Sequence, residues 1–96
     1  RIEEALSYLF SVIYMELISA KYGRKREYNE TIRDFGIVSV KEFGLDPSKV
    51  YPFIQRVEQY IYSRPSQVSE EDFRKTIQLF SPVYYQLTGT NFILNF

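Results

Sequence analysis

The sequence predicts an all-α fold, a small bundle of four to five helices with a central first helix. Apolar residues recur at helical spacing in four segments, and residues typical of helix ends bound each segment. The 96 residues are 45% hydrophobic and 18% aromatic, which is ample material for one packed core. We therefore expect residues 1–96 to form a single helical domain. The sequence leaves open whether this domain is a fragment of a longer, membrane-associated protein.

Two residue types that carry much of enzyme chemistry are missing from the chain. It has no cysteine, which excludes disulfides and thiol nucleophiles, and no histidine, the commonest general base and metal ligand. Its 12 Lys and Arg residues cancel its 12 Asp and Glu residues, so no overall field attracts nucleic acid or an anionic membrane. The composition therefore predicts neither an enzyme nor a bound cofactor or metal.

The first predicted helix spans residues 2–22 and ends at Gly23, a residue type common after helix C-termini. Its apolar stretch, residues 5–20, is shorter than the roughly 20 apolar residues of a membrane span, so we expect a buried helix. Glu16 interrupts the stretch, and we expect it near the rim or paired with an arginine. Apolar residues lie on nearly every face, as in a helix packed by several neighbours: Leu6, Leu9, Phe10, Ile13, Tyr14, Leu17 and Ile18.

The second predicted helix spans residues 30–43 and ends at Gly44. Gly36 and the β-branched residues that follow it lower the helix propensity of this segment. The sequence therefore leaves open one kinked helix or two short ones. One face carries apolar and small residues at helical spacing: Ile32, Phe35, Gly36, Ser39 and Phe43.

The third predicted helix has Asp46 as its cap and Pro47 in its first turn. Pro52 lacks a backbone donor, and an interior proline costs roughly 3 kcal/mol. We therefore expect the helix either to bend there or to begin only near Tyr51, and to end before residues 63–65. Its inward face is apolar: Val50, Ile54, Val57 and Ile61.

The stretch RPSQVSEEDFRK, residues 64–75, contains three adjacent carboxylates at positions 70–72. Adjacent helical residues point about 100° apart, so these carboxylates do not converge on one metal ion. Ser69 and Asp72 have instead the spacing of a helix-capping pair, and Val68 precedes the cap where a hydrophobic staple begins. The stretch therefore predicts a helix that starts at Ser69 and no metal site.

This last predicted helix runs towards Leu87 and ends at Gly89. Pro82 either kinks it or precedes a short fifth segment that starts at Ser81. The tail of residues 90–96 is apolar and uncharged. It is predicted either to pack on the core as an extended arm or to be the edge of a larger protein.

Four bases near the end of the first helix are the candidate contact surface for an anion or a partner: Lys21, Arg24, Lys25 and Arg26. Tyr22 and Tyr28 lie beside them, and bases interleaved with aromatic residues can grip phosphates and stack bases. Four charges there also suit an anionic membrane surface. The alternative, which the zero net charge favours, is a solvated helix end neutralised by Glu27 and Glu30.

Residues 40–58 resemble a helix–turn–helix, with a helix ending at Phe43, a turn at Gly44 and a second helix that meets the first at Val50. DNA-reading versions place a basic or amide-rich helix in the major groove. Here that helix has modest charge and carries Pro52 in its middle. A plain packing corner uses the same residues, and we favour it over DNA reading.

Residues 61–80, IYSRPSQVSEEDFRKTIQLF, resemble the C-terminal helical domain of the protein-glutamine gamma-glutamyltransferase-like family. In that family an aromatic-rich "RYS"-like element ends a helix, a proline-containing turn follows, and "VSEED" opens the last helix. The matching elements here are residues 62–63, Pro65 and residues 68–72. Other positions extend the resemblance over most of the chain: Tyr8, Leu9, Gly23 and Thr31.

The resemblance implies a non-catalytic cytosolic helical domain, attached to membrane segments and found beside transglutaminase-like proteins. Two features depart from the family pattern: Asp34 stands where its "T-x-x-E" opening has glutamate, and the NFILNF tail has no counterpart. Transglutaminase chemistry needs the cysteine and histidine that this chain lacks. The resemblance therefore carries over neither catalysis nor any site residue.

Together these observations predict a non-catalytic helical domain for protein–protein interaction or regulation, in the cytoplasm or at the cytosolic face of a membrane. We expect a protein partner or self-association, because the nine tyrosines offer an aromatic partner surface. Membrane contact is expected only through segments outside this chain. The alternative is a nucleic-acid-binding helix–turn–helix module that uses residues 40–58 and the basic loop 21–26. The richness in Ile, Tyr, Lys and Arg points to a thermophilic source.

Overall fold

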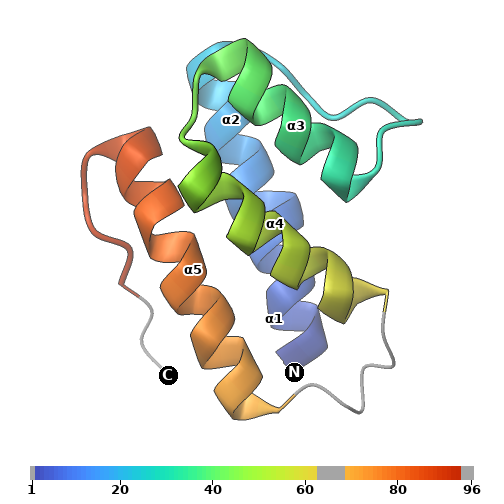
Figure 1. Ribbon diagram of the computed structural model, residues 1–96, viewed down its shortest axis with the longest axis vertical. Helices are drawn as coiled ribbons and strands as arrows, with labels where there is room; N and C mark the ends of the chain where they lie inside the picture. The colour runs from blue at the N-terminus through green and yellow to red at the C-terminus, as the bar shows by residue number, and fades with distance from the viewer. Residues whose placement is uncertain (1, 63–68, 94–96) are drawn as a thin grey trace.

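The computed structural model describes residues 2–62 and 69–93. These residues form four helical rods and no strand, which confirms the all-α prediction (Figure 1). The first rod, residues 2–22, is continuous but has three parts, and α4 crosses in front of it beside α5 (Figure 1). The element bounds are α1 Ile2–Tyr8, η1 Leu9–Tyr14, α2 Met15–Tyr22, α3 Ile32–Phe43, α4 Pro47–Ile61 and α5 Glu70–Thr88.

The first rod contacts all three other helices, as predicted for a central helix. The Tyr14 ring lies 6.1 Å from the ring of Phe35 on α3 and 5.6 Å from that of Phe53 on α4, centroid to centroid. The rod also packs along α5. Its remaining face is not covered, because Tyr8 is 58% exposed and Val12 is 40% exposed. The rod is therefore central without being enclosed on every side.

The middle part of the first rod, η1, is a π-helix, which the sequence analysis did not predict. Four residues of this rod, spaced four positions apart, are almost fully buried: Leu6, Phe10, Tyr14 and Ile18. In an α-helix, four residues overshoot one turn by about 40°, so a stripe at this spacing drifts around the rod. The wider π-turn, marked by the bond from the Met15 N–H to the Phe10 carbonyl, corrects that drift.

Helix α3 is one helix and not two. It begins at Ile32 behind the cap Thr31, whose hydroxyl accepts from the Asp34 N–H at 3.0 Å while the Asp34 carboxylate accepts from the Thr31 N–H at 3.2 Å. Gly36 does not kink the helix. Its lack of a side chain lets α4 come close, because a Cβ built on it would lie 3.0–3.3 Å from Ile54 side-chain atoms. The helix ends at Gly44, which has a left-handed backbone with φ of 70°.

Helix α4 begins at Pro47, so the expectation of a start near Tyr51 is wrong. The Asp46 carboxylate accepts the Ser48 N–H at 2.9 Å and caps the helix. Pro52 lies inside a helix that continues to Ile61. The free energy gained by packing the apolar face of α4 on the core outweighs the cost of the backbone hydrogen bond that Pro52 cannot donate. The helix ends at Ile61, with Tyr62 as its C-terminal cap, which confirms the predicted end before residues 63–65.

Helix α5 starts after Ser69, as predicted. The Ser69 hydroxyl accepts from the Asp72 N–H at 3.1 Å, and the Asp72 carboxylate accepts from the Ser69 N–H at 3.3 Å. Val68, the proposed staple residue, lies outside the described residues. The helix continues through Pro82 to Thr88, so no separate fifth segment forms, and it ends at Gly89.

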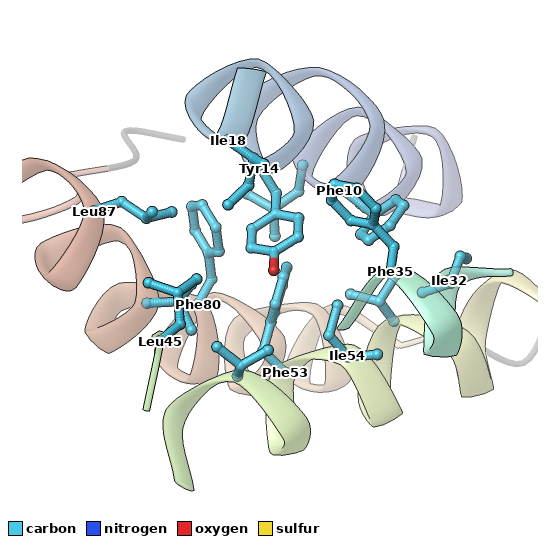
Figure 2. Close-up of a cluster of buried hydrophobic side chains, with 14 residues drawn as sticks. Phe10, Tyr14, Ile18, Ile32, Phe35, Leu45, Phe53, Ile54, Phe80 and Leu87 are labelled. Atoms are coloured by element: carbon cyan, nitrogen blue, oxygen red, sulfur yellow. The ribbon is translucent and has the colours of Figure 1, made fainter. Parts of the chain in front are cut away.

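A short chain of hydrogen bonds crosses the centre of the apolar core. The Tyr14 hydroxyl, which Figure 2 shows reaching from the first rod into the cluster, donates to Ser39 Oγ at 2.6 Å. Ser39 Oγ in turn donates to the Phe35 carbonyl at 2.8 Å. Both side chains are fully buried, and burial raises the pKa of Tyr14 from its ordinary 10.0 to about 12. The bonds satisfy polar atoms that are otherwise costly to bury.

Ser39→Ala is expected to lower the free energy of unfolding by about 1–3 kcal/mol, because the buried Tyr14 hydroxyl loses its acceptor. Tyr14→Phe should cost only about 0.5–1.5 kcal/mol, since Ser39 still donates to the Phe35 carbonyl. The double variant should cost less than the sum of the two, because no hydroxyl is then left unpaired. Urea unfolding of the four proteins measures this coupling, and additive costs would show that the bond is not made.

Candidate interaction surface

The structure divides the four predicted bases between different tasks. Lys21 Nζ donates to the Leu87 carbonyl at 3.2 Å, which ties the end of α2 to the end of α5. Arg24 forms two bonds to the Glu30 carboxylate, at 2.9 and 2.8 Å, and its guanidinium lies 5.8 Å from the centroid of the Phe35 ring. These two bases therefore hold the fold together at the end of the first rod.

The other two bases lie in the loop that joins α2 to α3. Lys25 is exposed, and Arg26 donates to the Glu30 carbonyl at 3.1 Å with its guanidinium 5.9 Å from the Phe10 ring. The four bases thus do not converge on one point. Glu30 takes part in the neutralisation that the zero net charge suggested, whereas Glu27 contributes its backbone N–H to Glu30 at 2.7 Å.

The hydrogen bond from Arg24 and that from the backbone of Glu27 lower the pKa of Glu30 from 4.5 to about 2. The same partnership with Glu30 raises the pKa of Arg24. A group whose pKa is lower in the folded state stabilises the fold fully above its unfolded-state pKa. This stabilisation is lost as the pH falls through its folded-state pKa. The Arg24–Glu30 pair should therefore stabilise the loop above about pH 4.5 and stop doing so near pH 2.

Glu30→Gln is accordingly expected to be less stable than the wild-type chain at pH 7. The gap in unfolding free energy should narrow below pH 4.5 and close near pH 2, where Glu30 is protonated in both states. Glu27→Gln on the same exposed loop is the control and should show a small gap throughout. Urea titrations at several pH values measure both, and a Glu30 gap that does not change with pH contradicts the pairing.

The predicted helix–turn–helix corner is present as a packing corner between α3 and α4. Leu45, directly after the Gly44 turn, and Val50 are both buried in the core. The outer side of the corner holds a groove of about 430 Å³. An ion pair between Arg33 and Glu58, with N and O atoms 2.8 Å apart, spans it. We call this the α3–α4 groove, and it is lined by Arg33, Ile37, Tyr51, Ile54, Gln55 and Glu58.

A second groove, of about 290 Å³, has no charged residue among its lining and lies between the first rod and α5. The chain turns back along α5 after Gly89 (Figure 1), and the Phe92 ring packs 5.0 Å from that of Phe80 and 5.1 Å from that of Tyr84. Phe92 thereby closes one side of the groove. We call this the apolar groove, and it is lined by Ala5, Tyr8, Leu9, Ile13, Phe73, Ile77 and Phe92.

The apolar groove has an exposed apolar side chain in its lining, and further exposed apolar residues are close to its lining residues in the sequence. Tyr8 lines it and is 58% exposed. Val12, next to the lining residue Ile13, is 40% exposed, and Ile93, next to Phe92, is 77% exposed. Phe92 confirms the extended-arm alternative for its part of the tail, while residues 94–96 lie outside the described residues. Sequence reasoning did not find this groove, although the uncharged tail was a signal for it.

The carboxylates at residues 70–72 divide their roles as a helix start requires. Asp72 completes the cap, and hydrogen bonds from Ser69 lower its pKa. Glu70 pairs with Arg74, with N and O atoms 2.8 Å apart. Within residues 2–62 and 69–93, no three acidic side chains gather in a way that could hold a metal ion. Glu16 is exposed, as a position near the rim requires.

Comparison with known proteins finds no matching family model, no matching curated protein and no matching solved structure. Among the helices that the structure describes, none is both long and apolar enough to cross a membrane.

Proposed function

We propose that this chain is a non-catalytic protein-interaction domain and that the apolar groove is its binding surface. The observation that carries the proposal is an uncharged groove between the first rod and α5, whose lining includes the exposed side chain of Tyr8. Exposed apolar side chains gathered around a concave site mark binding surfaces, whereas isolated ones need no explanation. The chemistry of this surface is that of the core of a protein interface, where charged residues are depleted and tyrosine is enriched.

The size of the groove fits side chains of another protein better than a free small molecule. Its volume of about 290 Å³ lies at the lower edge of the roughly 300–1,000 Å³ range of small-molecule pockets. Its lining offers no charged group that could orient a polar ligand. A few large aliphatic or aromatic side chains from a partner would fill it, in the manner of anchors at the centre of an interface.

The basic loop and the α3–α4 corner give weaker support to the nucleic-acid alternative. Lys21 and Arg24 already bind groups of the chain itself, and Glu58 lies on the outward side of α4 where a recognition helix needs bases or amides. Nucleic acid is therefore the second candidate and enters as an outcome of the test below. The resemblance of residues 61–80 supports a regulatory role for the domain on the cytosolic side of a membrane, which is part of the proposal.

Selection of peptides from a random displayed library tests the proposal. Peptides that bind the isotope-labelled chain should carry large apolar anchors and should shift the amide resonances of Tyr8, Ile13 and Ile77. Ala5→Phe, which fills the groove with a ring, should abolish the binding, whereas Ile37→Phe in the α3–α4 groove should not. Selected peptides that instead shift the amide resonances of residues lining the α3–α4 groove contradict the proposal. The proposal is also contradicted if the chain binds duplex DNA at low salt and the substitutions Lys25→Glu and Arg26→Glu abolish that binding.

A further inference from the structure

The α3–α4 groove differs from the apolar groove in two properties that suit a small ligand. Its volume is about 430 Å³, which lies inside the roughly 300–1,000 Å³ range of small-molecule pockets. Its lining includes one positive and one negative side chain, Arg33 and Glu58, next to apolar ones. Small-molecule pockets combine apolar walls with a few polar or charged groups that orient the ligand. The α3–α4 groove has both.

The charged and the apolar residues of this groove are separated along its helices. Arg33 and Glu58 are joined by an ion pair of 2.8 Å between α3 and α4. Ile37 is one turn, about 6 Å, beyond Arg33 on the same face of α3. Tyr51 is two turns, about 10 Å, before Glu58 on the same face of α4. Both apolar residues are exposed, so a ligand can place a charged head at the ion pair and an apolar body beside Ile37 and Tyr51.

The ion pair itself keeps capacity for a ligand. The Arg33 side chain is 71% exposed, and its Nη2 donates to Oε1 of Glu58. A guanidinium has five N–H donors, and a carboxylate has two acceptor oxygens. Among residues 2–62 and 69–93, no other group hydrogen-bonds to either of these charges. The remaining donors of Arg33 and the second oxygen of Glu58 can therefore bind a ligand.

The balance of charge selects the kind of ligand. A ligand with a carboxylate alone would pair with Arg33 but would also meet the carboxylate of Glu58. A ligand with an ammonium alone would pair with Glu58 and meet the guanidinium of Arg33. Like charges at such short range are unfavourable. A ligand that carries both charges side by side pairs with both groups, and the four charges then alternate in sign.

We propose that the α3–α4 groove binds a free α-amino acid with a large apolar side chain. Its carboxylate binds Arg33, its ammonium binds Glu58, and its side chain lies between Ile37 and Tyr51. A residue inside a peptide carries neither of these two charges, so this ligand is different from the partner proposed for the apolar groove. The site gives the domain a small-molecule ligand in addition to its protein partner.

NMR titration of the isotope-labelled chain with L-phenylalanine and three analogues tests the proposal. 3-Phenylpropionate lacks the ammonium, phenethylamine lacks the carboxylate, and N-acetylphenylalanine methylamide lacks both, like a residue inside a peptide. Phenylalanine should shift the amide resonances of Ile37, Ile54 and Gln55, which line the groove. Each analogue should bind at least about fivefold more weakly, because it loses a charge-assisted hydrogen bond.

Variants that remove one charge of the groove should change the order of the ligands. Glu58→Gln should weaken phenylalanine at least about fivefold and strengthen 3-phenylpropionate, because the repelling carboxylate is gone. Arg33→Gln should weaken phenylalanine and strengthen phenethylamine. Glu70→Gln is the matched control, since it removes the acid of another ion pair of 2.8 Å, on α5. A pair with a largely exposed arginine contributes little to stability, so the variants should fold, and thermal unfolding checks this.

Three results overturn the proposal. The first is equal binding of the four ligands, or no shift with phenylalanine at millimolar concentration. The second is an equal effect of Glu70→Gln and Glu58→Gln. The third is a set of shifts confined to Ile13 and Ile77, which line the apolar groove. The proposed function fails separately, because it concerns peptides that bind the apolar groove, whose lining includes neither Arg33 nor Glu58.

Discussion

Phe53→Ala is expected to lower the free energy of unfolding by about 3–5 kcal/mol, the usual cost of removing a large buried ring. Phe53 is fully buried on α4. Its ring lies 5.6 Å from that of Tyr14 on the first rod and 4.9 Å from that of Phe80 on α5, centroid to centroid. The ring therefore joins three of the rods, and its removal leaves a cavity that none of them can fill by a local shift.

Urea unfolding followed by circular dichroism measures this cost. Because small domains are stable by only about 5–15 kcal/mol, Phe53→Ala can be too unstable to give a folded baseline. Phe53→Leu keeps most of the volume and should cost about 1–2 kcal/mol. Tyr51→Ala, at a 39% exposed position on the same helix, is the control and should cost less than about 1 kcal/mol. Equal costs at Phe53 and Tyr51 would contradict this description of the core.

Gly36→Val is expected to lower the free energy of unfolding by about 3 kcal/mol, at the upper end of the usual cost of overpacking. A Cβ at Gly36 would lie 3.0 Å from Cγ1 and 3.1 Å from Cγ2 of Ile54, so the crossing of α3 and α4 is already crowded before the two methyl groups of valine are added. By propensity alone, replacement of a glycine inside a helix stabilises the helix. The sign of the effect therefore separates crowding from propensity.

The double variant Gly36→Val with Ile54→Ala gives this prediction a sharper form. Ile54→Ala alone should cost about 2–5 kcal/mol because it leaves a cavity. The valine at position 36 should then occupy part of that cavity, so the double variant should cost clearly less than the two single changes together. Urea unfolding of the four proteins provides the comparison. A stabilising Gly36→Val, or strictly additive costs, would show that α3 and α4 do not meet at this point.

Helix ends were the part of the fold that the sequence predicted best, because local chemistry decides them. Ser69 and Asp72 make both bonds of a capping box with residues three apart, so no tertiary information was needed. Gly23, Gly44 and Gly89 all adopt positive φ at the ends of their helices. The Thr31 cap shows the limit of this method, since the helix was expected from residue 30 and begins at Ile32.

The interiors of the helices were harder to predict, because packing overrides local preference there. Gly36, Pro52 and Pro82 each suggested a break, and each lies inside an unbroken helix. The space between helices gives Gly36 its role, and that space depends on Ile54, 18 positions further along the chain. The π-turn of η1 had a readable signal in the four-residue spacing of its buried residues, but that spacing also fits an α-helix over a short stretch.

The candidate surface could be predicted only in part. The four bases were visible as a cluster in the sequence, but the pairing of Arg24 with Glu30 depends on how the loop folds. The apolar groove was not visible, because residues 5–13 and 73–92 become neighbours only in the folded chain. The exposure of Ile93 is likewise a tertiary property. Single-sequence patterns identify which residues are apolar and leave open which of them the fold fails to cover.

The most direct test of the apolar groove as a binding surface is an isotope-filtered NOE experiment on the labelled chain mixed with an unlabelled peptide selected for binding to it. The experiment records only contacts between the chain and the peptide. Cross-peaks between apolar side chains of the peptide and protons of Ala5, Tyr8 and Ile77 are the predicted result. Cross-peaks to residues of the α3–α4 groove instead, or no cross-peak between peptide and chain, would contradict the proposal.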